Sequence, residues 1–387
     1  MFDHSDFDAI RPYRDDEVQH IFHELSNEPD FLRLIGFLYP ELSVKGFLKL
    51  LFSLNSIAEF QEQVIAPYVQ NIARLTADSL TIDGLEKLDK SKTYFYISNH
   101  RDIILDPAFL NILLISNSFD TTEIAIGDNL LIYPWIRHLV RLNKSFIVNR
   151  NVSVRQMFEV SQRLSDYIKH TMNDNGHSIW MAQREGRSKD ANDRTHLAVL
   201  KMLNMSGDSN FIDNMKELNF LPVSISYEYD PCDFLKAREF LLKRDNPEYK
   251  KTQEDDLESM FTGLKGYKGR VHFHICEPIT DELADLRDVG DRNQQVAGLA
   301  QLIDKHIHLN YRFYPGNFIA YDMLTGRDKF KDKYSEADKN KFHNYLENQV
   351  SKVPEKNKEY DFLLNSLIEM YSNPLINHYE AKGEPIV

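Results

Sequence analysis

The sequence predicts an α/β fold, with a mostly parallel sheet flanked by helices, a helical accessory region before it and a helical extension after it. The first observation is that short apolar segments alternate with longer amphipathic segments between about residues 80 and 285, which is typical of crossover units in a parallel sheet. The second is that apolar residues before residue 78 recur at intervals of three and four, without strand-like alternation. We therefore expect a helical accessory region at 1–78, an α/β domain at 79–322 and a helical C-terminal extension at 323–387.

Each element of the α/β domain follows from a local pattern. Short segments rich in β-branched and aromatic residues are expected as strands: SLTIDGLEKL (strand and turn), KTYFYISNH, TTEIAIGDN, KSFIVNR, HSIWMAQREG, NFLPVSISYEY and GRVHFHICEPI. Three segments with helical periodicity are expected between them: DPAFLNILLISN, which begins with Asp and Pro, PWIRHLVRLN and VRQMFEVSQRLSDYIKHTMND. In such sheets ligands bind beyond the carboxyl ends of the strands, so polar residues that follow a strand are the candidates for a site.

The composition excludes several classes of protein. The 387 residues carry a net charge of −13, which argues against a nucleic-acid partner held by a basic surface. The two cysteines, Cys232 and Cys276, are too few for a disulfide framework. No apolar run approaches the roughly 18–20 residues of a membrane span, and the first residues are acidic where a signal peptide would be basic. The sequence predicts a cytoplasmic protein, with peripheral contact to the inner face of the membrane as an open alternative.

Residues 31–57 are the reason for leaving membrane contact open. This segment is rich in Phe and Leu, with Lys and Arg spaced between them, a pattern that suits the surface of an anionic bilayer. One possible helical face would present Phe47, Leu48, Leu51 and Phe52, with lysines beside it. The other interpretation, which we favour, is a helix pair that packs on the α/β domain.

A first group of polar residues follows the predicted strand in YFYISNHRDIILDPAFL. An acid one or two turns along the next helix could hold one imidazole nitrogen of His100, which would fix the tautomer and leave the other nitrogen as a base for a hydroxyl. Asp106 and Asp102 are both candidates for that acid. The alternative is that His100 is a structural hydrogen-bonding residue.

A second group of polar residues follows the apolar segment SIWMA. A run of charges is usually a solvated loop, but a glycine between ionic residues lets the backbone turn while guanidinium groups point at one spot. We predict that Arg184, Glu185, Gly186 and Arg187 take part in binding an anionic group such as a phosphate. Arg150, which ends the segment KSFIVNR, is a further cation at the end of a strand.

Other activities that His-Arg-Asp suggests are not supported. The protein-kinase catalytic loop needs an Asn five residues after the Asp, where this chain has Pro107, and the sequence has no glycine-rich loop and no Asp-Phe-Gly. A phosphate-binding P-loop is also absent. The remaining histidines are scattered, and His272 and His274 alternate on one strand face, so we expect no metal and no cofactor.

Taken in order, these segments resemble the glycerolipid acyltransferase superfamily, which includes glycerol-3-phosphate and 1-acylglycerol-3-phosphate acyltransferases. Four blocks have counterparts over about residues 80–285: SNHRDIILDP, SFIVNR, AQREGRS, and FLPVSISY followed by ICEPI. Two departures stand out. Five residues separate His100 from Asp106 where the family has four, and Leu105 occupies the family spacing. Aligning Arg187 with the arginine of the third block puts Arg184 where the family usually has a glutamate.

The resemblance implies direct acyl transfer, with acyl-CoA or acyl carrier protein as the co-substrate. The implied acceptor is a hydroxyl of glycerol-3-phosphate or 1-acylglycerol-3-phosphate, in phospholipid biosynthesis. His100 would be the base, oriented by Asp106 or, as the alternative, Asp102, and Arg150, Arg184 and Arg187 would hold the phosphate. Two other functions stay open: O-acylation of an amino-acid-linked lyso-lipid, whose carboxylate the same arginines could hold, and a non-catalytic lipid- or acyl-carrier-binding protein.

Overall fold

The fold is built on one mixed sheet. The computed structural model describes residues 7–39, 42–131, 133–150, 152–207, 209–354, 359–384 and 386. Within these residues, seven strands form a sheet in the order β1-β7-β6-β2-β5-β3-β4. Their bounds are β1 (Ala77–Asp83), β2 (Phe95–Ser98), β3 (Glu123–Gly127), β4 (Ser145–Val148), β5 (Ile179–Ala182), β6 (Phe220–Tyr227) and β7 (Gly269–Ile275). Strands β2 to β6 run parallel, and β7 is antiparallel to β6 but parallel to β1. The predicted α/β class with a mostly parallel sheet is confirmed.

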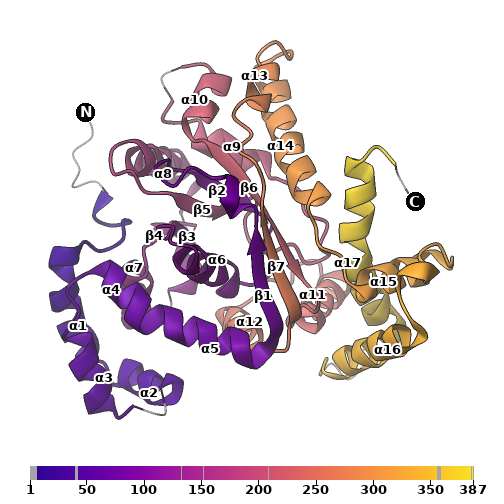
Figure 1. The fold of residues 1–387 in the computed structure, drawn as a ribbon, viewed down its shortest axis with the longest axis horizontal. Coiled ribbons are helices and arrows are strands. Elements are labelled where there is room, and N and C mark those ends of the chain that lie inside the picture. The colour runs from indigo at the N-terminus through magenta and orange to yellow at the C-terminus, as the bar shows by residue number, and fades with distance from the viewer. Residues whose placement is uncertain are drawn as a thin grey trace.

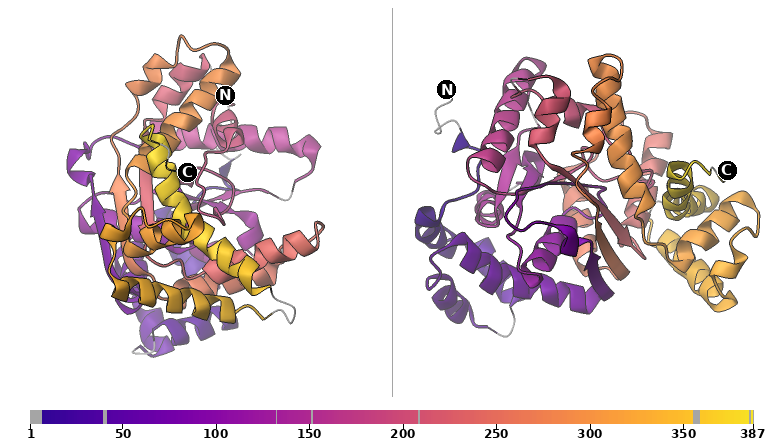
Figure 2. Two further views of the ribbon diagram at one scale, coloured as in Figure 1. Left: turned by 90° about the vertical axis from the view of Figure 1, so that its right-hand side faces the viewer. Right: turned by 45° about the horizontal axis from the view of Figure 1, so that its top comes forward.

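Helices cover both faces of the sheet (Figures 1 and 2). Alternate residues of a strand point to opposite faces, so Phe95 and Ile97 join one core while Tyr94 and Tyr96 join the other. The first face is covered by α8 (Val154–Asn173), α9 (Leu197–Leu203), α10 (Phe211–Glu217) and α14 (Arg292–Leu309), and the second by α5 (Ala66–Thr76) and α6 (Leu105–Ser116). The shorter α13 (Glu282–Asp285) precedes α14.

The N-terminal helices form a core of their own. They are α1 (Val18–Ser26), α2 (Pro29–Leu38), α3 (Val44–Leu51) and α4 (Ile57–Phe60), and a π-helical turn at Gln61–Ile65 continues into α5. Phe47 and Leu51 are buried in this core, while Leu48 and Phe52 are half-buried around it. This packing, which includes Leu142 of α7 (Pro134–Leu142), favours the interpretation that residues 31–57 pack inward; residues 40 and 41 lie outside the described residues.

The C-terminal helices lie on the other side of the sheet from the N-terminal helices (Figure 1). They are α15 (Pro315–Thr325), α16 (Glu336–Ser351) and α17 (Tyr360–Ala381), and they pack on α11 (Asp233–Asp245). The boundary predicted at 323 falls inside α15, and β1 begins at Ala77, just inside the boundary predicted at 78. None of the helices described here has both the length and the apolar character needed to cross a bilayer.

Candidate active site

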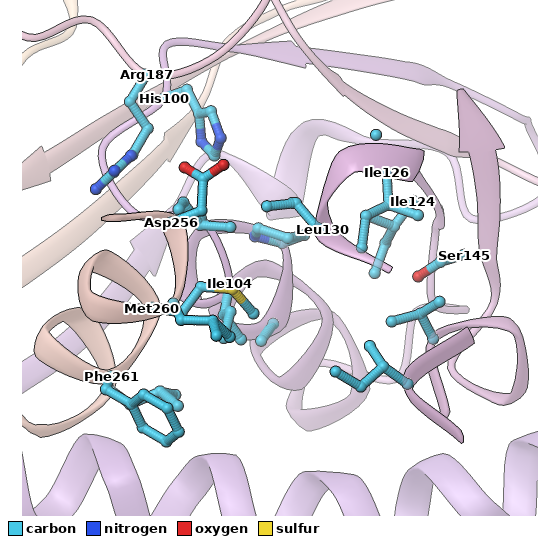
Figure 3. Close-up of a pocket in the computed structure, with 18 of the residues that line it drawn as sticks. His100, Ile104, Ile124, Ile126, Leu130, Ser145, Arg187, Asp256, Met260 and Phe261 are labelled. Atoms are coloured by element: carbon cyan, nitrogen blue, oxygen red, sulfur yellow. The ribbon is translucent and has the colours of Figure 1, made fainter. Parts of the chain in front are cut away.

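A large cavity lies between the sheet and the helices α2, α5, α6, α7 and α12 (Gln253–Lys265). Figure 3 shows His100 and Arg187 at one end, with apolar walls that include Ile104, Ile124 and Met260. The cavity has a volume of about 1470 Å³, above the range of about 300–1,000 Å³ typical of small-molecule sites. It therefore has room for a long apolar chain beside a polar group.

His100 and Asp106 form a hydrogen-bonded pair at the wall of this cavity. The Nδ1 atom of His100 lies 2.8 Å from Oδ2 of Asp106. The same oxygen accepts from the backbone N–H groups of Arg101 (2.6 Å) and Asp102 (3.0 Å), so the carboxylate is fixed by the loop that carries the imidazole. The edge of Trp180 packs against the imidazole, with ring centroids 5.7 Å apart. With Nδ1 turned to Asp106, Nε2 is the nitrogen available to a ligand in the cavity.

Asp102 makes different contacts from those the alternative assignment requires. Its Oδ1 atom accepts from the backbone N–H groups of Ile104 (2.9 Å) and Leu105 (2.8 Å), at the start of α6, as a capping residue does. Burial, and then the charge of Asp106, raises the pKa of Asp102 above its ordinary value. The structure therefore places Asp106, and not Asp102, against His100; the catalytic roles of both residues stay predictions.

A glycine on α12 makes room for Asp102. A Cβ atom at Gly263 would lie 2.0 Å from Oδ2 of Asp102, well inside contact distance, and the carboxylate cannot move away without losing its hydrogen bonds to the start of α6. Helix α12 therefore approaches the His100 loop closely only because residue 263 has no side chain.

Replacing Gly263 by alanine is expected to destabilise the protein by about 1–3 kcal/mol, because the added methyl group overpacks the contact between α12 and Asp102. Thermal unfolding of the purified variant measures this loss. Gly36→Ala is the matched control, since Gly36 is also helical but has no atom of the described residues within 4 Å of the added Cβ, and there alanine should be neutral or stabilising. Equal melting temperatures for Gly263→Ala and the wild type would contradict the close approach.

The loop that carries His100 is anchored by buried polar groups. The amide of Asn99 pairs with both backbone groups of Ile225 in β6, through Nδ2 to the carbonyl (2.9 Å) and from the N–H to Oδ1 (2.8 Å). The guanidinium of Arg101 binds Asp193 through two bonds, of 3.0 and 2.6 Å. Bidentate pairs of this kind are geometrically specific, so these neighbours of His100 hold the loop rather than face a substrate.

The predicted anion-binding residues meet at the same cavity. Arg150, Arg184, Glu185, Gly186 and Arg187 all line it together with His100. Gly186 has a φ of +68°, a left-handed conformation that glycine adopts without strain, and this turn carries its charged neighbours to the cavity wall. Strand pairing explains why the His100 and Arg184–Arg187 segments meet. Strands β2 and β5 are adjacent and end together at Ser98 and Ala182, so the loops that follow them begin side by side.

The arginines differ in how far their charge is already neutralised. Arg187 is half-buried near Asp102, Asp230 and the Cys232 thiol. Although desolvation opposes its charge, these neighbours raise its pKa above the ordinary value. Among the described residues, the guanidinium of Arg150 has only one ion-pair contact, a long one of 3.7 Å to Glu185. The Nε atom of Arg184 is buried and makes no hydrogen bond to any described residue. The Nη1 atom of Arg187 also lacks a hydrogen-bond partner among the described residues, but its charge faces Asp102 and Asp230, so Arg184 and Arg150 have more uncompensated charge to offer an added anion.

Lysines of α11, of α12 and of the loop between them also line the cavity, although these segments carry no recognisable motif. Among the described residues, seven cations line the cavity: Arg150, Arg184, Arg187, Lys189, Lys243, Lys251 and Lys265. Only three acids do so: Glu185, Asp190 and Asp256. The cavity is thus locally basic in a protein of net charge −13, which favours an anionic ligand. Part of this charge is already paired, since Lys251 lies 2.5 Å from Asp256 and Lys243 lies 2.9 Å from Glu239.

Comparisons with known proteins bear on this site. Residues 79–225 match the Acyltransferase family profile. Among solved structures, the 1-acyl-sn-glycerophosphate (LPA) acyltransferase PlsC from Thermotoga maritima is similar, with a TM-score of 0.37 and 14% sequence identity, over 77% of this chain and 96% of that chain. No curated protein matches the sequence. The family match begins within β1 and ends within β6, and so includes the loops that carry His100, Arg150 and Arg187.

Proposed function

We propose that this chain, whose residues 79–225 match the Acyltransferase family profile, transfers a fatty acyl group to a hydroxyl of glycerol-3-phosphate or 1-acylglycerol-3-phosphate. The donor in this proposal is acyl-CoA or acyl carrier protein. The observation that carries the proposal is the His100–Asp106 pair, at 2.8 Å, on the wall of a cavity that has both apolar walls and an excess of cations. That combination suits a ligand with a long acyl chain and an anionic head.

In the proposed reaction His100 is the general base. Its Nε2 atom takes the proton of the acceptor hydroxyl, the oxygen attacks the thioester carbonyl carbon, and the carbon–sulfur bond breaks. The imidazolium then returns the proton to the leaving thiolate, so no covalent enzyme intermediate is needed. Asp106 accepts the Nδ1–H bond, which keeps Nε2 unprotonated before the attack and stabilises the imidazolium after it.

The acceptor's phosphate is assigned to the basic part of the cavity. A phosphate brings close to two negative charges, and an arginine beside it forms strong charge-assisted hydrogen bonds. Arg184, whose Nε atom has no hydrogen-bond partner among the described residues, and Arg150, whose only ion pair within them is long, are the proposed ligands. Arg187 contributes charge from a half-buried position near Asp102.

Replacing Arg184 or Arg150 by alanine is expected to raise the acceptor's KM about 10-fold or more, a loss that corresponds to one charge-assisted hydrogen bond of roughly 1.5–3 kcal/mol. The donor's KM should change little, because the thioester does not depend on these guanidinium groups. Initial rates measured while each substrate is varied in turn separate the two constants. Arg244→Ala is the matched control, since Arg244 on α11 forms surface ion pairs with Asp245 and Glu359 and does not line the cavity. An equal rise in both KM values would point to damage to the fold instead.

A panel of acceptors tests the proposed function itself. The purified protein is incubated with long-chain acyl-CoA, or with acyl carrier protein that bears a long-chain acyl thioester, and with glycerol-3-phosphate, lysophosphatidate or an amino-acid-linked lyso-lipid, and released thiol is measured. Thiol release that depends on one of the two phosphate acceptors supports the proposal. Turnover with the amino-acid-linked lyso-lipid alone would replace the acceptor but keep the reaction. Binding of acyl donor without turnover of any acceptor would favour a lipid- or acyl-carrier-binding protein.

A further inference from the structure

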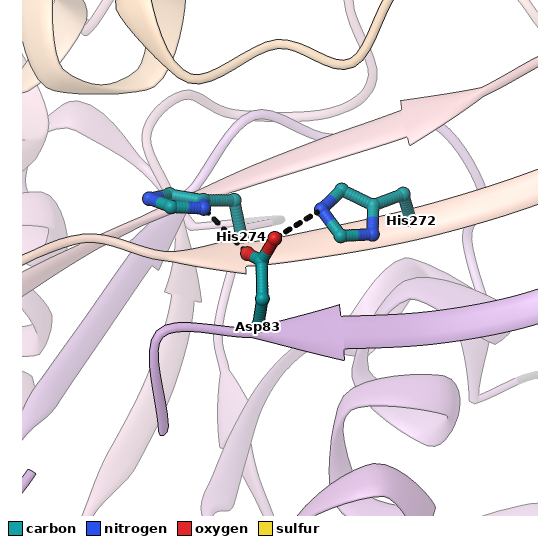
Figure 4. Close-up of side chains that lie close together, drawn as sticks. All are labelled: Asp83, His272 and His274. Atoms are coloured by element: carbon teal, nitrogen blue, oxygen red, sulfur yellow. Dashed lines mark hydrogen bonds and ion pairs between the residues drawn. The ribbon is translucent and has the colours of Figure 1, made fainter. Parts of the chain in front are cut away.

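Two histidines and an aspartate meet on the sheet, away from the cavity (Figure 4). His272 and His274 are two residues apart on β7, so their side chains share one face of the sheet. Asp83 is the register partner of His274 on the neighbouring strand β1, which brings its carboxylate to the same face. The hydrophobic residues between and beside the histidines, such as Phe273, point to the opposite core. None of these three residues is among the described residues that line the cavity.

We propose that Asp83, His272 and His274 form a binding site for a divalent metal ion of the zinc type. Two imidazoles and one carboxylate are a preferred ligand set for Zn²⁺ and its neighbours in the first transition series. One ligand atom from each residue can be chosen so that all three lie within 4.8 Å of one another. Bonds of about 2.0–2.2 Å would place the ligand atoms of a tetrahedral site about 3.3–3.6 Å apart, and Nε2 of His272 already lies 3.3 Å from Oδ2 of Asp83.

The hydrogen bonding of His272 supports this assignment. Its Nδ1 atom lies 2.8 Å from the hydroxyl oxygen of Thr81, and that hydroxyl lies 3.4 Å from the carbonyl of Val271. When the hydroxyl donates to this carbonyl, it accepts the Nδ1–H bond and leaves a lone pair on Nε2 directed at the Asp83 carboxylate. A lone pair facing a carboxylate is stabilised by a cation between them. A histidine that binds a metal characteristically has its other nitrogen held by an oxygen in this way.

A positive charge already competes for the same carboxylate. Nη2 of Arg312 lies 3.3 Å from Oδ2 of Asp83, and about half of the Arg312 side chain is exposed. An exposed arginine can turn into solvent when a metal binds, but its charge opposes the ion while it remains. The site therefore makes two opposite predictions: removing a ligand abolishes binding, and removing Arg312 strengthens it. A plain ion-pair cluster predicts no metal binding in either case.

Metal titration of the untagged 387-residue chain, after dialysis against a chelator, tests the proposal. We expect one equivalent of Zn²⁺ in equilibrium dialysis, and for Co²⁺ the visible absorption of a tetrahedral complex. Asp83→Asn and His274→Gln should lose both signals, Thr81→Val should bind about 10–100-fold more weakly, and Arg312→Gln should bind more tightly than the wild type. His274→Gln keeps the test valid if Asp83→Asn fails to fold, because His274 is partly exposed.

The matched control is His306→Gln. His306 and Glu282 form a solvent-accessible pair of 2.8 Å, and the pair is not part of any three-ligand group among the described residues. The control should bind Zn²⁺ as the wild type does. Absence of stoichiometric binding in both the wild type and Arg312→Gln would overturn the proposal, as would binding that survives in Asp83→Asn.

Discussion

Replacing His100 by alanine is expected to lower kcat for acyl transfer by about 10²–10⁴-fold, the usual contribution of a positioned general base. The acceptor hydroxyl then has no group at Nε2 of residue 100 to take its proton as the thioester is attacked. Because a base acts in the transition state more than in substrate binding, KM for the acyl donor should change much less than kcat. Release of thiol from acyl-CoA, measured with both donor and acceptor at saturating concentrations, gives kcat directly.

His177→Ala is the control for this substitution. Nδ1 of His177 lies 3.0 Å from Oε1 of Glu123, so His177 forms the same kind of imidazole–carboxylate pair, but it does not line the cavity. Its removal should leave kcat unchanged. Full activity in His100→Ala, with a normal melting temperature, would show that the chain does not use His100 as the base and would remove the observation that carries the proposed function.

The sequence predicts the fold class well because the signals are local. Strand length, β-branched content and the start of each helix are encoded within a few residues, and the alternation of strands and helices then implies parallel crossover units. The same logic predicts that residues following neighbouring strands converge. His100 follows β2 and Arg184 follows β5, and these strands are adjacent in the sheet, so both side chains line one cavity.

The rest of the site depends on contacts between segments far apart in the sequence. Helix α12 closes one side of the cavity with Met260, Phe261 and Leu264, yet nothing in its amphipathic sequence says which face of the sheet it meets. The need for a glycine at 263 appears only when α12 is docked against Asp102. The places of Lys243 and Lys251 at the cavity also could not be predicted from the sequence, since isolated lysines on charged segments resemble ordinary surface residues.

The group of Asp83, His272 and His274 shows the same limit. The sequence favours no metal there, because the two histidines have no third ligand nearby along the chain. Asp83 lies 191 positions from His274, and it becomes a neighbour only because β1 pairs with β7 at the edge of the sheet. The pairing of an edge strand is a tertiary outcome that neither residue signals locally.

The spacing between His100 and the acid that orients it is the clearest case where geometry adds to the sequence. Counting residues leaves Asp102 and Asp106 as alternatives, because the path of the loop is unknown. In the structure Asp102 turns to the N–H groups that begin α6, while Asp106 on the first turn of α6 reaches back to the imidazole. The extra residue in this loop relative to the acyltransferase family is thus compatible with a His–Asp contact of ordinary length.

Replacing Asp106 by asparagine is expected to lower kcat by about 10²–10⁴-fold while the protein stays folded. The amide oxygen can still accept from the backbone N–H groups of Arg101 and Asp102, but an uncharged amide is a weaker acceptor for the Nδ1–H of His100 and holds the base tautomer less firmly. It also removes the negative charge that stabilises the imidazolium. Steady-state kinetics together with a melting curve distinguishes this loss from unfolding.

Replacing Asp102 by asparagine should instead lower the stability of the protein and leave kcat nearly unchanged. Its side-chain oxygen can still accept from Ile104 and Leu105, but the negative charge near the half-buried Arg187 is lost. We therefore expect a destabilisation of about 1–3 kcal/mol, with kcat per folded molecule close to that of the wild type. The two variants are compared by measuring kcat at a temperature where both are folded and by recording a melting curve for each. We expect kcat to fall in Asp106→Asn and the melting temperature to fall in Asp102→Asn. If Asp102→Asn abolishes turnover while Asp106→Asn retains it, Asp106 does not orient the base, and the 2.8 Å contact between His100 and Asp106 is structural rather than catalytic.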